Sequence, residues 1–377
     1  MTDITIAHLS LNRGGGAERV CLTLIETLIN AGYSVSVATL ERTDWKMLEK
    51  RFGKVAIPDS EFYFINNTSS FNMPLQAAVS LLFPTMLLLL KRRKHDLLIN
   101  TYGDLIEGLA DLAYINAIPI KLSYRISSGL SHSIIWRAAT CAYDKISSVS
   151  FSSKRSLLIS NSRFIQNILL KRMNLNSIVI HPPVEVDTFI GKTRGKRENL
   201  VAVVSRLRPG KRLDAVPKIA SLIKEAEFVL LGIADSSSKT TVKELINLTK
   251  HLGVNDRVKI LLNQQFENYV SILSSASLYL HTQPSEAFGI SAVEAMAAGC
   301  VPIVPRSGGP WTDILDRMQG LYGFSYNDET EAADLIRGLI NDKFLRKKVA
   351  ERARNRALNF KKSIFKEKIL NIVNKVL

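Results

Sequence analysis

The feature that most constrains the fold of this chain is a repeated alternation between short strand-like runs and longer helix-like runs. The chain opens with a strand-like run, a glycine-rich loop, a helical run and a second strand-like run, at residues 4–9, 14–16, 18–30 and 34–40. This order favours parallel strands joined by crossover helices. It continues with a helical pattern at 163–171 and strand candidates at 96–100, 121–125, 156–160 and 177–181. We therefore expect a doubly wound α/β domain in the first half of the chain.

A proline-rich break divides this alternation in two. Pro182 and Pro183 stop regular structure, and a polar, glycine-containing stretch follows at residues 191–197. The strand-like runs then restart at 201–204, 227–231, 258–262, 278–281 and 301–304. A length of 377 residues suits two domains of ordinary size. We predict a first domain at residues 1–182, a linker at 183–198 and a second domain at 199–359, with a ligand cleft between the two sheets.

The composition narrows the classes of partner. Hydrophobic residues make up 46% and charged residues 22% of the chain, which suits two full cores and excludes a disordered protein. The formal net charge of +16 indicates a polyanionic partner, either nucleic acid, an anionic membrane or a phosphorylated substrate. The chain has no helix-turn-helix, zinc-finger or aromatic-basic RNA-binding pattern, so we do not expect nucleic acid. A solvated basic surface without a specific partner is the alternative.

Cysteine usage and the N-terminal residues indicate a cytoplasmic location. Cys21, Cys141 and Cys300 lie far apart and form no CxxC pair, so we expect neither a disulfide framework nor a zinc site. Residues 1–6 carry no basic segment ahead of an apolar one, so no signal peptide is expected. No run reaches the ~18 uninterrupted apolar residues of a membrane-spanning helix.

Two carboxylates eight residues apart, Glu286 and Glu294, are the first candidates for chemistry. Glu286 follows a loop, whereas Glu294 lies in a helix-favouring run at 292–298, so we place it about two turns into a helix. Gly289 between them has no Cβ, so a ligand can approach the backbone there. A helix start attracts phosphate, and a carboxylate nearby can accept hydrogen bonds from sugar hydroxyls. The pattern predicts a sugar-nucleotide site, and an ordinary amphipathic helix with one solvated Glu is the alternative.

A basic loop follows the first strand of the second domain. It contains two cations, Arg206 and Lys211, five positions apart. A departing nucleoside diphosphate gains negative charge as its bond breaks, and fixed cations beside it lower the barrier. Arg grips phosphate through two bonds, whereas Lys acts as a point charge. A solvated basic face is the alternative interpretation.

The glycine-rich loop at 14–16 precedes the first helix, where backbone N–H groups can approach phosphate. Gly14 and Gly16 also fit part of a dinucleotide fingerprint, and Glu41 ends the next strand, which leaves a dehydrogenase as an alternative. However, Arg19 stands where the third glycine belongs. The Gly191-Lys192-Thr193 string resembles the end of a P-loop but lacks its first glycine, so we reject that interpretation.

Together these motifs resemble one known group of enzymes. The Glu-x7-Glu spacing with Phe288-Gly289, and the run Glu-Ala-Met-Ala-Ala-Gly at 294–299, look like the retaining glycosyltransferases of family four. Arg206-x4-Lys211 and the Gly15-Gly16-Ala-Glu-Arg string look similar to that family as well. The resemblance implies the GT-B fold, an α/β class with two doubly wound parallel-sheet (Rossmann-like) domains and a cleft between them. It also implies that the last helix, at 360–377, crosses back to the first domain.

The resemblance further implies a role for each candidate residue. Arg206 and Lys211 would stabilise the leaving diphosphate, and Glu286 would hold sugar hydroxyls. Donor binding would involve Gly15, Gly16, Phe288, Gly289, Ile290 and Glu294, with Glu294 on the ribose and the two glycines letting the first domain close on the donor phosphates. The implied mechanism is a front-face one, in which the departing phosphate oxygen accepts the acceptor proton. No Asp-x-Asp motif is present, so we expect neither a metal ion nor another cofactor.

A second motif bears on the donor. Gly308-Gly309-Pro310 with Asp313-Ile314 looks like the dolichol-pathway α-1,2-mannosyltransferases, which favours GDP-mannose, and a Gly-Gly-Pro turn could bring backbone N–H groups towards the cleft. The family often has a histidine near the strand that ends at about Arg125. Here none stands at the expected position, and His132 is a candidate by proximity alone.

These observations predict a retaining transferase that moves mannose from GDP-mannose onto a lipid-linked saccharide at the cytoplasmic membrane face. One alternative is the same chemistry with a UDP-sugar donor and a soluble acceptor. Another is a non-catalytic sugar-nucleotide-binding subunit, although such a protein has no need of Arg206, Lys211, Glu286 and Glu294 together.

The net charge suggests how the chain would reach a membrane. The mostly apolar run at 75–90 ends in the basic cluster Lys91–Lys94. An apolar helix with a basic end can lie at an anionic interface, so we expect a peripheral protein on an anionic membrane surface. The alternative is that this helix belongs to the core of the first domain.

Overall fold

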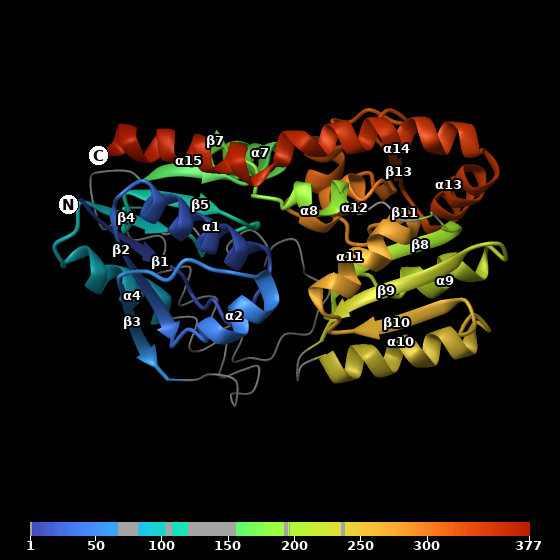
Figure 1. Ribbon diagram of the computed structural model, residues 1–377, viewed down its shortest axis with the longest axis horizontal. Coiled ribbons are helices and arrows are strands. Elements are labelled where there is room, and N and C mark those ends of the chain that lie inside the picture. The colour runs from blue at the N-terminus through green and yellow to red at the C-terminus, as the bar shows by residue number, and fades with distance from the viewer. Residues whose placement is uncertain are drawn as a thin grey trace. The chain divides into compact units, whose positions relative to one another are not determined.

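A computed structural model describes residues 2–66, 82–102, 108–119, 156–191, 195, 197–234 and 238–377. Its contacts divide the chain into two compact units, which are described separately. Unit 1 comprises residues 1–183 and 363–377, and unit 2 comprises Val184–Lys362. Each unit is built around its own parallel β-sheet (Figure 1). The α/β fold class predicted from the sequence is therefore confirmed.

Unit 1 contains a seven-stranded sheet in the order β3-β2-β1-β4-β5-β6-β7. The strands are β1 (Asp3–Ala7), β2 (Ser34–Glu41), β3 (Ser60–Ile65), β4 (Leu97–Asn100), β5 (Leu112–Ile115), β6 (Leu157–Ser160) and β7 (Ile178–Val179). The described helices are α1 (Gly16–Asn30), α2 (Trp45–Phe52), α4 (Leu82–Lys91), α7 (Arg163–Met173) and α15 (Lys362–Val376). All described strand pairs are parallel, as the alternating pattern predicts.

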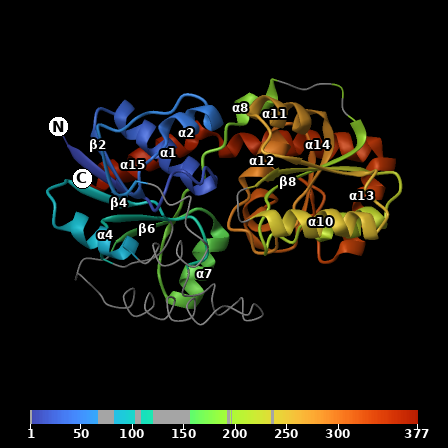
Figure 2. The same cartoon turned by 90° about the horizontal axis from the view of Figure 1, so that it is seen from below.

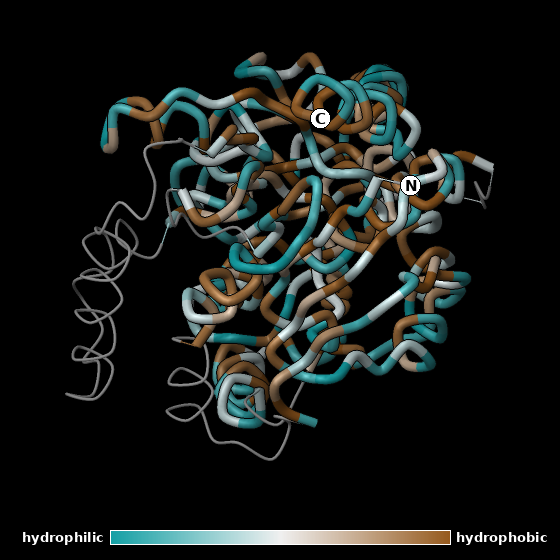
Figure 3. The backbone as a smooth tube through the Cα atoms, turned by 90° about the vertical axis from the view of Figure 1, so that its left-hand side faces the viewer, coloured by the Kyte–Doolittle hydropathy of each residue, from teal (hydrophilic) through white to brown (hydrophobic). Residues whose placement is uncertain are grey.

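Helices cover both faces of this sheet. One face, which includes Ile4 and Ile6, packs against α1, α2 and α15, whereas Ala7 and Leu9 pack against α4. Figure 2 shows α4 and α7 on the opposite side of the sheet from α1, α2 and α15. Apolar and hydrophilic segments, brown and teal in Figure 3, alternate along the backbone because each strand and helix turns only part of its surface inward.

Unit 2 contains a six-stranded sheet in the order β10-β9-β8-β11-β12-β13. The strands are β8 (Arg197–Arg206), β9 (Glu227–Ile233), β10 (Val258–Leu262), β11 (Ala276–Leu280), β12 (Val301–Pro305) and β13 (Phe324–Tyr326). The helices are α8 (Val186–Ile190), α9 (Ala215–Ser221), α10 (Lys239–His251), α11 (Phe266–Ser275), α12 (Ile290–Ala297), α13 (Glu329–Asn341) and α14 (Lys343–Ala357). A π-helical turn spans Pro310–Ile314 and a 3-10 turn spans Leu358–Phe360.

The stretch predicted as a linker differs from the prediction. Residues 183–198 include the helix α8 and the start of β8, and Val184 onward belongs to unit 2. Val186 and Phe189, three residues apart, fall on one face of α8 and are buried in the core. Backbone bonds tie Val184 to the end of the 3-10 turn, since Val184 N donates to Phe360 O at 3.1 Å. The two prolines therefore mark a domain boundary without producing a long linker.

The last helix, α15, packs within unit 1. Phe365, Ile369 and Val373 recur every fourth residue and are buried against the sheet. Lys366 Nζ lies 2.6 Å from Glu26 Oε1, and Tyr33 Oη donates to Asn374 Oδ1 at 2.6 Å. The predicted helix at 360–377 thus begins at Lys362, and its described contacts join it to the first sheet.

Candidate active site

The two predicted basic residues leave the carboxyl end of β8. Arg206 is the last residue of that strand, and Lys211 follows in a tight turn through Gly210. Lys211 Nζ lies 3.0 Å from Glu286 Oε2 and also bonds to Gln283 Oε1. Because β8 and β11 are neighbours in the sheet, the loops after them meet at one edge. The structure thus brings together Lys211 and Glu286, which are 75 residues apart.

The charges around Glu286 keep it ionised. Burial alone would raise the pKa of Glu286, but the Lys211 ammonium and the Arg206 guanidinium outweigh it and hold that pKa below its usual range. Glu286 is therefore a carboxylate at neutral pH, suited to accept hydrogen bonds from hydroxyl groups. Lys211 and Glu286 are each about a quarter exposed, at 22% and 23%, so an incoming molecule can reach the pair.

Two residues near this pair were missed by the sequence analysis. Tyr279 in β11 and His281 just after it are two positions apart, so their side chains point to the same side of the sheet. Tyr279 Oη lies 3.1 Å from His281 Nδ1 and 2.8 Å from Ser291 Oγ. Burial, with Lys211 adding to it and Glu286 opposing it, lowers the pKa of His281 to about 4, so the imidazole stays neutral. The i, i+2 spacing of two polar side chains at a strand end was the available signal.

The loop that carries Glu286 is held by the Gly-Gly-Pro turn after β12. Gly309 N donates to Glu286 O at 2.8 Å. A Cβ on Gly309 would lie 2.3 Å from Ala287 O, and one on Gly308 would lie 2.6 Å from Glu286 O. Only glycine permits this backbone-on-backbone contact. We expected the Gly-Gly-Pro turn to point its backbone N–H groups towards a ligand. Instead, the N–H of Gly309 holds the loop of Glu286 in place through the carbonyl of that residue.

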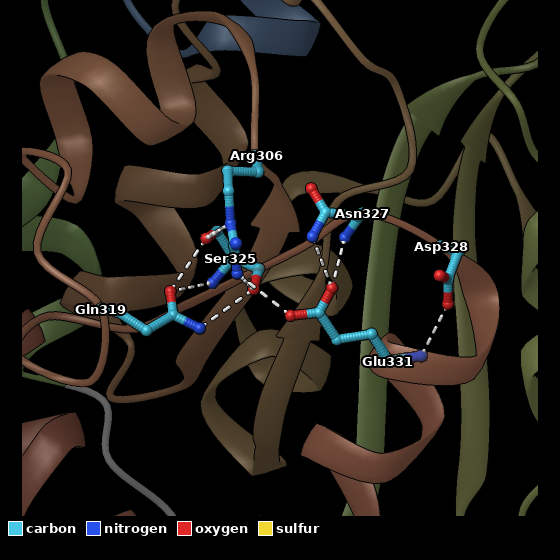
Figure 4. Close-up of polar contacts among 6 residues, drawn as sticks. All are labelled: Arg306, Gln319, Ser325, Asn327, Asp328 and Glu331. Carbon is cyan, nitrogen blue, oxygen red and sulfur yellow. Dashed lines mark hydrogen bonds and ion pairs between the residues drawn. The ribbon is translucent and has the colours of Figure 1, made fainter.

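A polar network anchors the strands behind this turn. Arg306, which follows β12, bonds to Ser325 of β13 and to Glu331 of α13, with Arg306 Nη2 3.0 Å from Glu331 Oε1. Gln319 bonds to Ser325 in three ways, and Asn327 bonds to Glu331 (Figure 4). These contacts secure the short edge strand β13, which pairs with β12 just before the Gly-Gly-Pro turn.

Gly289 sets where α12 begins. Its φ of +100° is left-handed, which favours glycine, and a Cβ there would lie 2.9 Å from Pro310 Cγ. The helix therefore begins at Ile290, and Glu294 lies just over one turn into it, not two as predicted. Glu294 is 3% exposed, and Tyr269 Oη donates to its Oε2 at 2.5 Å. Ile290 is partly buried at the first helical position.

The side chain of Phe288 is buried and packs edge-on against Phe360, with ring centroids 5.4 Å apart. The donor-binding role of Phe288 stays a prediction. Burial of a large aromatic ring stabilises a protein core, and edge-on contact between two rings adds to that stabilisation. The side chain of Phe288 therefore belongs to the core of unit 2, where it fixes the loop between Glu286 and α12.

The glycine-rich loop lies in unit 1, at the start of α1. Gly15 caps the helix, and its N–H donates to Glu18 Oε2 at 2.7 Å. Glu18 in turn lies 3.8 Å from His8 Nε2. Gly16 is the first residue of α1, and the role of Gly15 and Gly16 towards donor phosphates stays a prediction.

Other expectations concern the remaining polar groups. Glu41, the residue that left a dehydrogenase as an alternative interpretation, is buried and accepts a hydrogen bond from Ser10 Oγ. Across the described ranges, no cluster of three or more His, Cys, Asp or Glu side chains could hold a metal ion. The strand candidate at 121–125 and His132 fall outside the described residues.

Comparison with known proteins defines the domain that carries the site. Residues 187–356 match the family described as glycosyl transferases group 1. The chain carries a group 1 glycosyltransferase domain. Within unit 2, this domain contains Arg206, Lys211, Glu286 and Glu294, so the resemblance predicted from the motifs is confirmed.

Curated relatives of this glycosyltransferase domain share part of the chain. One is the "GDP-Man:Man(3)GlcNAc(2)-PP-Dol alpha-1,2-mannosyltransferase" of Dictyostelium discoideum, 27% identical over 225 residues, which cover 55% of this chain and 44% of the relative. The Mus musculus protein of the same name is 29% identical over 201 residues, 49% of this chain and 41% of the relative. A "D-inositol 3-phosphate glycosyltransferase" of Mycobacterium leprae is 31% identical over 158 residues, 40% of this chain and 37% of the relative. The matched region thus spans less than half of each of these relatives.

Solved structures agree with the fold along the whole chain. The Anabaena protein Alr3699/HepE, solved with UDP and glucose, superimposes with a TM-score of 0.70 at 20% identity, over 99% of this chain and 100% of that one. WaaG, a glycosyltransferase involved in lipopolysaccharide biosynthesis, gives a TM-score of 0.71 at 14% identity, over 99% of each chain. The predicted GT-B fold is therefore confirmed. At these identities the likeness concerns the fold alone.

Proposed function

We propose that this protein is a retaining glycosyltransferase that moves mannose from GDP-mannose onto a lipid-linked saccharide. The observation that carries the proposal is the meeting of Arg206, Lys211 and Glu286 at the carboxyl ends of β8 and β11 within a group 1 glycosyltransferase domain. Parallel sheets bind ligands at that edge. The names of the Dictyostelium and mouse relatives support GDP-mannose as donor and a dolichol-diphosphate-linked acceptor.

The cations would act on the leaving group. Negative charge accumulates on the diphosphate as the glycosidic bond breaks, and Arg206 and Lys211 would stabilise it without any reorganisation. Lys211 is fixed by Glu286 and Gln283, so its ammonium is already in place before the donor binds. In a front-face mechanism the departing phosphate oxygen takes the proton of the acceptor hydroxyl, so no protein base is required.

The two carboxylates would bind different parts of the donor. Glu286, ionised and partly exposed, would accept hydrogen bonds from hydroxyls of the sugar. Glu294 would bind the ribose, with Tyr269 orienting its carboxylate by the 2.5 Å hydrogen bond. Gly15 and Gly16 remain candidates for contact with the donor phosphates.

A different donor is the main alternative. A UDP-sugar donor with a soluble acceptor is the alternative predicted from the sequence, and the Anabaena protein of similar fold was solved with UDP and glucose. A non-catalytic sugar-nucleotide-binding subunit is the alternative from another class. Lys211 and Glu286 form a paired, accessible site, which a protein without turnover would not need.

The proposal includes a peripheral position at the cytoplasmic face of an anionic membrane. Within the described ranges, no helix combines the length and the apolar character needed to cross a bilayer. The cluster Lys91–Lys94 was the predicted docking site. Its helix α4 buries Phe83, Met86, Leu87 and Leu90 in the core of unit 1, which supports the core-helix alternative. Lys91 also bonds to Gly108 O, and the Arg93 guanidinium lies 4.3 Å from the ring centroid of Phe62.

A transfer assay tests the proposed function. The purified protein is incubated with GDP-mannose, UDP-glucose or ADP-glucose and a saccharide linked to a lipid diphosphate, and the product is analysed by NMR for the configuration at the new linkage. We expect transfer from GDP-mannose with an α linkage. Transfer from UDP-glucose alone would move the assignment to the alternative donor. Donor binding without transfer or hydrolysis would support a non-catalytic subunit.

A further inference from the structure

The junction of α13 and α14 forms a fixed corner in unit 2. Asp342 follows α13 and caps α14, because its carboxylate accepts from Leu345 N at 2.8 Å. Arg346 is buried, and its Nη1 donates to Leu339 O at 2.8 Å and to Ile340 O at 3.0 Å. Figure 1 shows the two helices meeting at one end of the unit. These bonds secure the first turn of α14.

The helix α14 has one buried and one exposed face. Val349, Ala353 and Ala357 are buried in the core of unit 2. Phe344 points the other way and is 79% exposed, the highest value among large hydrophobic side chains in the described part of the chain. Lys348 follows Phe344 by four residues, so the two lie on the same side of the helix.

Basic side chains surround the exposed ring. Lys343, Lys347, Lys348 and Arg352 are all exposed on α14. The acidic residues beside them are Asp342, which caps the helix, and Glu351. An exposed aromatic ring among flexible cations matches the interface of an anionic bilayer, where the ring enters the headgroup region and the lysines contact phosphate. Nucleic acid would use the cations but would not need a protruding Phe on a rigid helix.

We propose that this surface, the α14 outer face (Lys343, Phe344, Lys347, Lys348 and Arg352), docks the protein on an anionic lipid bilayer. The lysines attract the acidic headgroups, and Phe344 supplies apolar contact once they are reached. The inference extends the proposed function, because a lipid-linked acceptor resides in a bilayer. The test below contains neither donor nor acceptor, so docking and transfer can fail independently.

Vesicle flotation tests the inference on the full chain. The vesicles contain phosphatidylcholine alone or phosphatidylcholine with phosphatidylglycerol. The first variant combines Lys347→Glu with Lys348→Glu, and its control combines Lys368→Glu with Lys375→Glu, which changes the net charge equally on exposed positions of α15. The second variant is Phe344→Ser, and its control is Leu170→Ser, another exposed apolar residue, on α7. All four proteins are checked by circular dichroism and thermal unfolding.

We expect wild type to bind only the anionic vesicles. Each basic residue near such a surface changes affinity by about fivefold, so the double lysine variant should lose at least about 20-fold, and its control much less. Phe344→Ser should weaken binding to the anionic vesicles, whereas Leu170→Ser should keep it. Equal losses in a variant and its control, or binding that depends only on the Lys91–Lys94 cluster, would overturn the inference. Loss of binding to single-stranded DNA in the lysine variant, with vesicle binding intact, would assign the surface to nucleic acid and overturn it as well.

Discussion

Replacing Lys211 by alanine should slow turnover far more than it weakens donor binding. The Lys211 ammonium lies 3.0 Å from Glu286 Oε2, and its loss would leave that carboxylate without its closest cation. A unit charge about 4 Å from a developing phosphate charge, at an effective dielectric of about 20, contributes about 4 kcal/mol. Mutations that remove one such stabilising group from an enzyme usually lower kcat by about 10²–10³-fold.

The observed effect should lie near the lower end of that range. Lys211 is 22% exposed, so solvent screens part of its charge, and Arg206 remains beside the site. We therefore expect Lys211→Ala, and likewise Arg206→Ala, to lower kcat by roughly 10²-fold or more, with a smaller effect on the affinity for the donor.

Steady-state kinetics with GDP-mannose checks this expectation. The matched control is Lys218→Ala, because Lys218 pairs with Asp214 at 2.6 Å on the same unit and is 47% exposed. The control should retain wild-type kinetics. Circular dichroism and thermal unfolding establish that each variant is folded. A folded Lys211→Ala or Arg206→Ala protein with wild-type turnover would refute the assignment of both cations to the leaving group.

Three further predictions concern the surroundings of this site. Gly309→Ala should destabilise unit 2 and lower turnover, because its Cβ would lie 2.3 Å from Ala287 O. The control is Gly338→Ala on α13, whose Cβ would meet nothing within 4 Å and which should be neutral or stabilising by about 0.4–1 kcal/mol. Thermal unfolding in which both variants behave alike would contradict this. His281 has a pKa of about 4 in the folded protein against about 6.5 when unfolded, so the unfolded chain binds more protons between these values and stability falls as the pH drops through that window. The free energy of unfolding of His281→Phe, measured with denaturant, should change less across this pH window than that of wild type, by up to about 3 kcal/mol. An unchanged pH profile would refute this. Activity should survive EDTA if fixed cations replace a metal, and full loss with recovery on adding manganese would argue for a metal-dependent enzyme.

Much of the architecture could be predicted because parallel strands buried on both faces leave an unmistakable pattern. The runs at 34–40 and 301–304 correspond closely to β2 and β12, which are largely buried strands rich in β-branched or apolar residues. The strands β3, β5 and β13 were missed. β5 and β13 contain only four and three residues, too few for a strand pattern to stand out in the sequence. β3 is an edge strand whose Tyr63 and Phe64 are exposed, so it shows no buried run.

The candidate site was predictable where a motif specifies chemistry, and less so where packing decides. The motifs predicted Arg206, Lys211 and Glu286 in loops after strands, and the structure brings Lys211 to Glu286. Phe288 was assigned to the donor because the motif contains it. The contact of its side chain with Phe360, 72 positions later, could not be predicted from the local pattern. In the same way, the left-handed Gly289 delays the helix and moves Glu294 one turn closer to its start.

Titration calorimetry with GDP-mannose tests the central claim most directly. The account predicts saturable binding to wild type, binding at least about tenfold weaker to Glu294→Ala, and nearly unchanged binding to Glu286→Ala, whose defect should appear mainly in turnover. The reason is that Glu294 would hold the ribose of every bound donor, whereas Glu286 would act on the sugar that is transferred. Unchanged affinity in a folded Glu294→Ala protein, or no binding of any GDP-, UDP- or ADP-sugar to wild type, would contradict the account.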